Sequence, residues 1–289
     1  MSIDADASRP LSIAISYPFA LGTRSGGSAS AFETARELAR LGQRVALLPV
    51  SAVGWTSFPR PRVTGELLGD ERRRALEAEG VEVVPVTPSR VSQWLDSGRV
   101  AREVRRLARR RRLDVLLGFH HEAAGLPVEA ERLGARFAMI TIWQSYRAAL
   151  GDGFEGVGMK RAARWLNRRA VARPLRRAEA LFATSRFTRR ELVEVVGVDA
   201  GRVEVCYQGV DPVFATVPRS EPAEIRRLLF FGRLTPGKGL GDALRALAPL
   251  AGRAGAPRCA RLRGEGGGRP DAEPAAELGI RAHHERLPF

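Results

Sequence analysis

Lysine is scarce in this chain, although its formal net charge is strongly positive at +15. Only Lys160 and Lys238 are lysines among the 47 lysine and arginine residues. Such an arginine bias is typical of a GC-rich genome and not of a surface adapted to polyanions. Aromatic residues interleaved with cations, and the signatures of known nucleic-acid-binding modules, are also lacking. The sequence therefore predicts no nucleic-acid partner.

Cysteines and long apolar segments are equally few. Cys206 and Cys259 are too few for a disulfide framework and lack the spacing of metal ligands, so we expect two buried thiols in a reducing compartment. Residues 1–10 are polar, no apolar segment of signal-peptide type follows them, and no run of about 18 apolar residues is present. We expect a cytoplasmic protein, in which any membrane contact is peripheral.

Short apolar segments alternate with segments of helical periodicity through most of the chain. Strands are expected at 11–15, 45–50, 81–86, 113–118, 136–142, 178–184 and 203–206. A helix is expected at 29–41 with Ser28 as its N-cap, and Thr188 and Glu191 have the spacing of a capping box at the start of a later helix. This alternation indicates a doubly wound, largely parallel α/β sheet over residues 1–214.

Residues 215–224 contain proline, serine and acidic side chains, and we expect them to link this domain to a second one at 225–289. Expected in the second domain are a strand at 228–231, a helix at 239–250, a strand at 258–263 and a helix at 272–278. Its length is less than half of the roughly 100 to 150 residues of a typical doubly wound domain. We therefore predict that the second domain is incomplete.

Two arginine-rich segments allow two interpretations each. Residues 102–112 contain seven arginines, with Val104, Leu107 and Ala108 on one face. This segment suits either a membrane-surface helix or an outer helix of the α/β domain, and its narrow apolar stripe without an aromatic anchor favours the outer helix. The segment 160–177, which contains Trp165, leaves the same two alternatives.

The most informative segment is the turn that follows the expected strand at 228–231. Arg233 and Lys238 lie in this turn together with glycines and a proline, and a helix is expected to begin where the turn ends. Backbone N–H groups at a helix N-terminus, with two cations beside them, favour the binding of a phosphate. The alternative is an ordinary surface turn with two solvated cations.

Two further motifs follow strands of the first domain. Gly26 and Gly27 lie in a glycine-rich loop after the first strand, where backbone N–H groups can approach a ligand closely. His120 follows the strand at 113–118, and His121 competes with it for the same role. The alternative to a functional role is a histidine at the start of a helix that faces solvent. Neither motif by itself is specific for one ligand.

Taken in order, these motifs resemble the retaining glycosyltransferases of family 4, which have the GT-B fold. The resemblance rests on Gly26 and Gly27, on His120, on the segments Ala183–Thr188 and Gln208–Asp211, and on Arg233 with Lys238. It implies an N-terminal Rossmann-like doubly wound domain, on the acceptor side, plus an incomplete second Rossmann-like domain that binds the donor. It also implies transfer of a sugar from a nucleotide-diphosphate sugar to an acceptor with retention of configuration.

The resemblance further implies roles for single residues. Arg233 and Lys238 match cations that bind the donor diphosphate, and Gly26 and Gly27 match a loop that approaches the phosphates or the acceptor. His120 matches a catalytic histidine near the donor sugar, which bonds a hydroxyl or stabilises positive charge through its carbonyl oxygen. No metal and no cofactor is implied besides the nucleotide-sugar co-substrate. The acceptor stays open, with lipid-linked and glycan acceptors as the candidates.

One part of the family pattern is missing, namely two glutamates separated by seven residues in the C-terminal domain. Glu265 and Glu273 have this spacing, but Glu265 follows Lys238 too soon to match. We therefore expect a chain that is truncated relative to the family. Besides an active glycosyltransferase, the sequence leaves open an inactive relative that binds the donor diphosphate weakly and, last, a basic protein that binds polyanions or a membrane surface.

Overall fold

The computed structural model describes residues 9–22, 26–52, 69–91, 93–141, 146–150, 161–210, 213–216, 218, 227–231, 239–247, 249, 259–263 and 282–285. The chain divides into two compact units, Met1–Gly209 and Val210–Phe289. Each unit is described by itself below.

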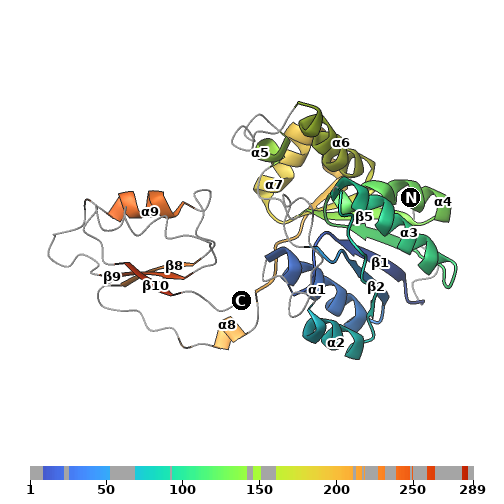
Figure 1. Ribbon diagram of the computed structural model, residues 1–289, viewed down its shortest axis with the longest axis horizontal. Coiled ribbons are helices and arrows are strands. Elements are labelled where there is room, and N and C mark those ends of the chain that lie inside the picture. The colour runs from blue at the N-terminus through green and yellow to red at the C-terminus, as the bar shows by residue number, and fades with distance from the viewer. Residues whose placement is uncertain are drawn as a thin grey trace. The chain divides into compact units, whose positions relative to one another are not determined.

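A seven-stranded sheet of strand order β3-β2-β1-β4-β5-β6-β7 forms the centre of the first unit (Figure 1). Its strands are β1 (Ser12–Tyr17), β2 (Arg44–Pro49), β3 (Glu82–Val83), β4 (Val115–Gly118), β5 (Arg136–Thr141), β6 (Ala180–Ala183) and β7 (Val203–Val205). Every neighbouring pair is parallel. All seven strands overlap the predicted segments, although β1 extends to Tyr17, beyond the predicted end at residue 15, and β2 begins at Arg44, one residue early. The predicted doubly wound α/β sheet is confirmed.

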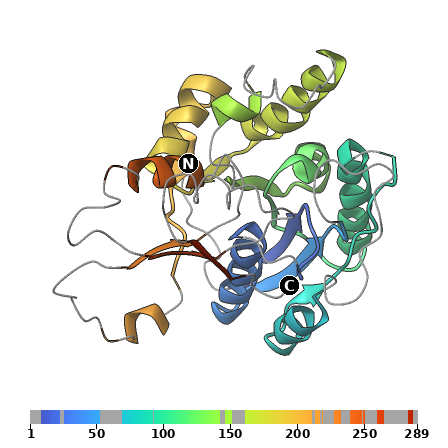
Figure 2. The same ribbon diagram turned by 60° about the vertical axis from the view of Figure 1, so that its left-hand side comes forward.

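Helices cover both faces of this sheet. The helical elements are α1 (Gly26–Arg40), α2 (Asp70–Ala78), η2 (Gln93–Leu95), α3 (Asp96–Ala108), η3 (His121–Gly125), α4 (Leu126–Leu133), α5 (Tyr146–Leu150), α6 (Arg161–Arg177), α7 (Arg186–Glu191), η5 (Leu192–Val196) and η6 (Ala200–Arg202). Figures 1 and 2 show α1 and α2 together on one side of the sheet, with α3, α4 and α6 on the other.

The two faces follow from the alternation of side chains along each strand. Ile13 and Ile15 of β1 are buried in one core with Phe32 of α1. Ala14, between them, is buried in the other core with Val104 of α3. A sheet that is covered on both faces needs apolar residues at successive positions, which explains the apolar runs of the sequence.

The arginine-rich helix α3 is an outer helix of this layer. Its apolar residues Val100, Val104 and Leu107 are buried in the core, and Arg102 and the C-cap residue Arg109 are exposed. The outer-helix interpretation of this segment is therefore confirmed. No helix in the described part of the chain is long and apolar enough to cross a bilayer.

Two predictions of helix caps are wrong. Helix α1 begins at Gly26, so Ser28 is its third residue, and the buried Ser28 hydroxyl accepts a hydrogen bond from Arg72 (3.1 Å). Ser185 caps α7, because its Oγ accepts a hydrogen bond from the N–H of Thr188 (3.0 Å). Glu191 accepts a hydrogen bond from the N–H of Tyr146 instead of closing a capping box. In both cases a partner from another element decides the role of the side chain.

The expectation of a buried thiol is wrong for Cys206, which is exposed. Cys206 directly follows β7, and β7 is the strand at one edge of the sheet. An edge strand has a neighbour on one side only, so the residue after its end has little around it to cover its side chain.

The second unit contains a smaller parallel sheet of strand order β10-β9-β8 (Figure 1). Its elements are α8 (Val213–Thr216), β8 (Arg227–Phe231), α9 (Leu240–Leu247), β9 (Cys259–Arg263) and β10 (Ala282–Glu285). Gly239, just before α9, has φ 76°, a backbone conformation that favours glycine. Strand β10 was not predicted, because its sequence Ala-His-His-Glu is short and polar. The helix predicted at 272–278 lies outside the described residues.

Candidate functional site

The two motifs of the first domain follow β1 and β4, which are neighbours in the sheet. Ile13 and Ile15 pair in parallel with Val115 and Leu117, so the carboxyl ends of both strands lie at the same edge. From β1 the sheet continues to β2 on one side, and from β4 to β5 on the other. Ligands of open α/β sheets bind outside the carboxyl ends of the strands where the order reverses in this way. The strand order reverses between β1 and β4, and Gly26 and His120 follow these two strands in the chain. A ligand site is therefore expected at the sheet edge where β1 and β4 end.

A buried carboxyl group, that of Glu122, holds the turn after β4. Its Oε1 accepts hydrogen bonds from the N–H groups of Phe119 (3.0 Å) and His120 (3.1 Å) and from the hydroxyl of Ser16 (3.0 Å). Ser16 belongs to β1, so this one oxygen joins the turn to the neighbouring strand. Within the described residues, the buried Oε2 of Glu122 has no hydrogen-bond partner.

Burial raises the pKa of Glu122 to about 7, although the hydrogen bonds from Phe119, His120 and Ser16 lower it in part. A protonated Glu122 can still accept these hydrogen bonds through its carbonyl oxygen. The folded chain therefore binds a proton at Glu122 over a pH range in which the unfolded chain, with a carboxyl pKa of 4.5, has already released it.

This difference predicts a pH-dependent stability. The stability that the protonated Glu122 contributes is fully present below pH 4.5 and is lost as the pH rises through about 7. Glu122→Gln mimics the protonated form at every pH. We expect the free energy of unfolding of Glu122→Gln, minus that of the unmodified chain, to increase by about 3 kcal/mol between pH 5 and pH 8. Urea unfolding of both chains at several pH values measures this difference.

His120 changes the stability with pH in the opposite direction to Glu122, but it does not affect the difference between Glu122→Gln and the unmodified chain. Burial lowers the pKa of His120 well below its usual value, and the adjacent His121 lowers it further. His120 therefore makes stability rise with pH up to about 6.5. Because both chains contain His120, its contribution cancels in the difference. A difference that stays constant from pH 5 to pH 8 would show that Glu122 does not titrate in this range.

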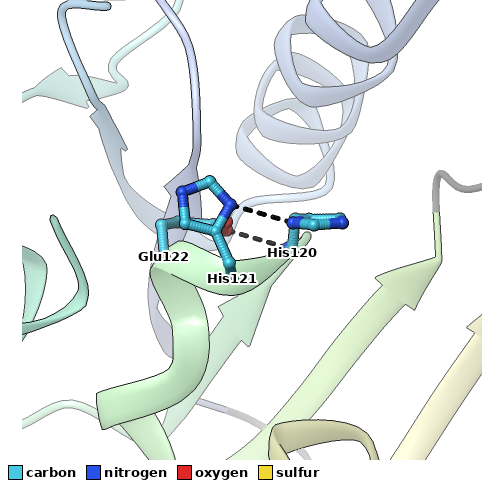
Figure 3. Close-up of side chains that lie close together, drawn as sticks. All are labelled: His120, His121 and Glu122. Atoms are coloured by element: carbon cyan, nitrogen blue, oxygen red, sulfur yellow. Dashed lines mark hydrogen bonds between the residues drawn. The ribbon is translucent and has the colours of Figure 1, made fainter. Parts of the chain in front are cut away.

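The two histidines of the turn are buried and lie against each other (Figure 3). Their Nδ1 atoms are 2.9 Å apart, and their rings meet edge to face with 5.1 Å between centroids. One Nδ1 donates and the other accepts, so one ring has a hydrogen on Nδ1 and the other does not. The alternative of a solvent-facing His120 is wrong. Since both rings are buried in one turn, the structure does not choose between His120 and His121.

His120, His121 and Glu122 also form a group that could offer ligand atoms to a metal ion, because one such atom of each lies within 4.8 Å of the others. The Nδ1 atoms of the two histidines share a hydrogen bond, and Oε1 of Glu122 already accepts three hydrogen bonds. A cation at Nδ1 and Oε1 would have to displace these hydrogen bonds, whereas Oε2 of Glu122 has no hydrogen-bond partner among the described residues. That the protein uses no metal stays a prediction.

Gly26 and Gly27 are the first two residues of α1, with Gly26 exposed and Gly27 partly exposed. Among the described residues, a Cβ built on Gly26 would meet no atom within 4 Å. Packing against these residues therefore does not require a glycine at position 26.

Arg72 of α2, a residue that the sequence analysis missed, holds the backbone that precedes α1. The Arg72 guanidinium donates hydrogen bonds to the carbonyl oxygen of Leu21 (2.9 Å) and to the hydroxyl of Ser28 (3.1 Å). Gly69, with φ 73°, lies so close to Gly22 that a side chain at position 69 would overlap its backbone. Arg72 is the first of three consecutive arginines in α2, and nothing in the sequence distinguishes it from Arg73 and Arg74.

Arg233 and Lys238 lie outside the described residues. The elements on either side of their turn are described, since β8 ends at Phe231 and α9 begins at Leu240. The strand and the helix of the predicted strand-turn-helix unit are thus present. The role of the two cations stays a prediction.

Comparison with known proteins places this geometry in a family. The model of Glycosyltransferase Family 4 matches residues 24–214. A sequence search of curated proteins gives no match. The fold is similar to that of a glycosyltransferase from Rickettsia africae, with a TM-score of 0.63 and 15% identity over 97% of this chain and 69% of the other.

Two further solved structures show the same fold. HepE of Anabaena, in complex with UDP and glucose, gives a TM-score of 0.62 with 15% identity over 96% of this chain and 70% of that one. WaaG, a glycosyltransferase involved in lipopolysaccharide biosynthesis, gives a TM-score of 0.61 with 15% identity over 96% of this chain and 70% of that one. The chain, with its parallel α/β units of GT-B type, belongs to glycosyltransferase family 4.

Proposed function

We propose that this chain is a retaining glycosyltransferase that takes its sugar from a nucleotide-diphosphate sugar. One observation carries the proposal: the N-terminus of α1 at Gly26 and the buried turn at His120 follow neighbouring parallel strands in a chain of family 4. The structure of HepE with UDP and glucose supports this class of donor. In this proposal residues 1–214 face the acceptor and residues 225–289 bind the donor.

In the proposed reaction, the bond between C1 of the sugar and the diphosphate oxygen breaks, and its electron pair leaves with the diphosphate. The acceptor hydroxyl attacks C1 on the same face and transfers its proton to the departing diphosphate. Arg233 and Lys238 stabilise the negative charge that develops there, Arg233 through paired N–H donors and Lys238 as a point charge. The products are a glycoside and a nucleoside diphosphate.

His120 acts in this proposal as a neutral group. Its lowered pKa keeps the imidazole uncharged, so that it does not repel the positive charge of an oxocarbenium-like transition state. Its carbonyl oxygen accepts a hydrogen bond from the N–H of Ala123 (3.1 Å), and a carbonyl oxygen has two lone pairs. His120 can thus bind a sugar hydroxyl through its ring or stabilise positive charge through its carbonyl oxygen.

Arg233→Ala and Lys238→Ala are each expected to lower kcat/KM by on the order of 100-fold, because each removes one contact to the charge that develops in the transition state. The assay is donor hydrolysis or transfer with a panel of UDP-, GDP- and ADP-sugars, with the anomeric configuration of the product determined by NMR. Arg245→Ala, in an exposed arginine of α9, is the matched control. Unchanged activity in both site variants would show that the diphosphate site is assigned wrongly.

The same panel tests the other interpretations that the sequence leaves open. Binding of UDP or GDP in calorimetry, without turnover of any donor, would support an inactive relative that retains the diphosphate site. A lipid-linked acceptor and a peripheral membrane contact predict that added vesicles raise the transfer rate. A glycan acceptor predicts transfer without them.

A further inference from the structure

A second group of cations lines a cavity between α5, α6 and η5. The cavity has a volume of about 850 Å³, within the range of small-molecule sites. Its polar lining consists of Arg147 of α5 and of Arg169, Arg173, Arg176 and Arg177 of α6. Among the lining residues that the structure describes there is no aspartate or glutamate. None of them belongs to the site at β1 and β4.

The spacing along α6 brings like charges together. Trp165, Arg169, Arg173 and Arg176 follow one another at intervals of three or four residues and therefore lie on one face of the helix. Cations at this spacing destabilise a helix by mutual repulsion, which a bound anion would relieve. Arg147 adds a cation from a second helix.

Two of the arginines are held by the protein, and two are not. Arg176 donates a hydrogen bond to the carbonyl oxygen of Val196 (2.7 Å), and Arg177 pairs with Glu131 (2.8 Å). In the described part of the chain, no hydrogen bond or ion pair holds the side chain of Arg147 or Arg173. A guanidinium has five N–H donors, so donors remain available in this cavity.

An aromatic surface lies beside these donors. Trp165 is 55% exposed, and the guanidinium of Arg169 lies over its ring at 4.7 Å from the centroid. An exposed indole next to a set of cations can cover a ring or a short apolar chain that carries an anionic group. Arginine pairs with phosphate oxygens through two parallel N–H donors.

We propose that this cavity binds a phosphate ester, with the phosphate on Arg169 and Arg173 and the organic part against Trp165. The phosphate belongs either to a small phosphorylated molecule or to the headgroup of an anionic lipid, since both present the same oxygens. The proposal does not depend on glycosyl transfer, because no residue of the cavity takes part in the reaction described above.

The test measures binding without any nucleotide sugar. The probes are glycerol 3-phosphate, in titration calorimetry, and vesicles of phosphatidylcholine with and without an equal part of phosphatidylglycerol, in sedimentation. The cavity variant is Arg169→Gln with Arg173→Gln. The matched control is Arg102→Gln with Arg109→Gln, which removes the same charge from an exposed position of α3 and from its exposed C-cap residue.

The cavity variant is expected to weaken binding of one probe by about tenfold or more, and the control to leave it unchanged. Loss of glycerol 3-phosphate binding assigns a small phosphorylated ligand, and loss of vesicle binding alone assigns a lipid headgroup. Equal weakening by both double variants, or no binding of either probe, would overturn the proposal. Tighter binding of a single-stranded RNA than of both probes would overturn it as well. Because phosphate can also bind at Arg233 and Lys238, UDP binding is measured in all variants and is expected to be unchanged.

Discussion

Replacing Glu122 by alanine is expected to lower the free energy of unfolding by about 4 kcal/mol at pH 5. The carboxyl group is fully buried, and its Oε1 is the acceptor for the N–H groups of Phe119 and His120 and for the hydroxyl of Ser16. Alanine would leave these three donors buried without an acceptor, at a cost of about 1–3 kcal/mol each when no water enters. It would also open a small cavity.

The experiment is urea unfolding at pH 5, where Glu122 is protonated in the folded chain. Glu122→Gln retains an oxygen acceptor and is expected to stay within about 1 kcal/mol of the unmodified chain. Glu131→Ala, in an exposed glutamate of α4, controls for the loss of a surface carboxylate. If Glu122→Ala costs no more than Glu131→Ala, the turn does not depend on the Glu122 hydrogen bonds.

Gly118→Ala is expected to lower the free energy of unfolding by about 3 kcal/mol, because the added methyl has no room. Gly118 is the last residue of β4, and a Cβ built on it would overlap the Cβ of Ala123 in η3. Ala123 cannot turn away, since its Cβ is fixed to the backbone. The strand and the turn that carries His120 would have to separate.

The control for this variant is Gly98→Ala. Gly98 lies in α3, and a Cβ there would meet no atom of the described residues within 4 Å. Because alanine favours a helix over glycine, Gly98→Ala is expected to raise the free energy of unfolding by about 0.5–1 kcal/mol. Thermal or urea unfolding measures both variants. A change in the free energy of unfolding that has the same sign in Gly118→Ala and Gly98→Ala would contradict this packing argument. Donor hydrolysis by Gly118→Ala then reports whether activity needs the turn in place.

The order of the strands in the chain could be predicted because its signal is local. Segments such as Leu113–Gly118 and Arg136–Ile142 are mostly apolar over strand length. A buried parallel strand needs that pattern wherever it lies in the sheet. Strand β10 escaped prediction for the same reason, since its residues give no apolar signal.

The two predictions of helix caps were wrong because short polar side chains have several hydrogen-bond partners within reach. Ser28 and Thr188 both carry a hydroxyl at a helix start, and sequence spacing alone does not tell which residue precedes the first turn. Arg72 of α2 donates a hydrogen bond to the Ser28 hydroxyl, and the N–H of Tyr146 in α5 donates one to the Glu191 carboxylate. These partners come from elements that only the folded chain brings close.

By itself, the sequence determined the parallel α/β class, the order of its elements and the resemblance that the match to family 4 confirmed. It also singled out His120 and the pair Gly26 and Gly27, whereas the roles of Arg233 and Lys238 stay predictions. Only the tertiary structure decided that His120 is buried and that a carboxyl group fixes its turn. The physical reason is distance along the chain: Ser16 and Glu122 are 106 residues apart, and their hydrogen bond exists only because β1 and β4 pair. Periodicity and spacing describe neighbours within a few residues, and they contain no information about such a pair.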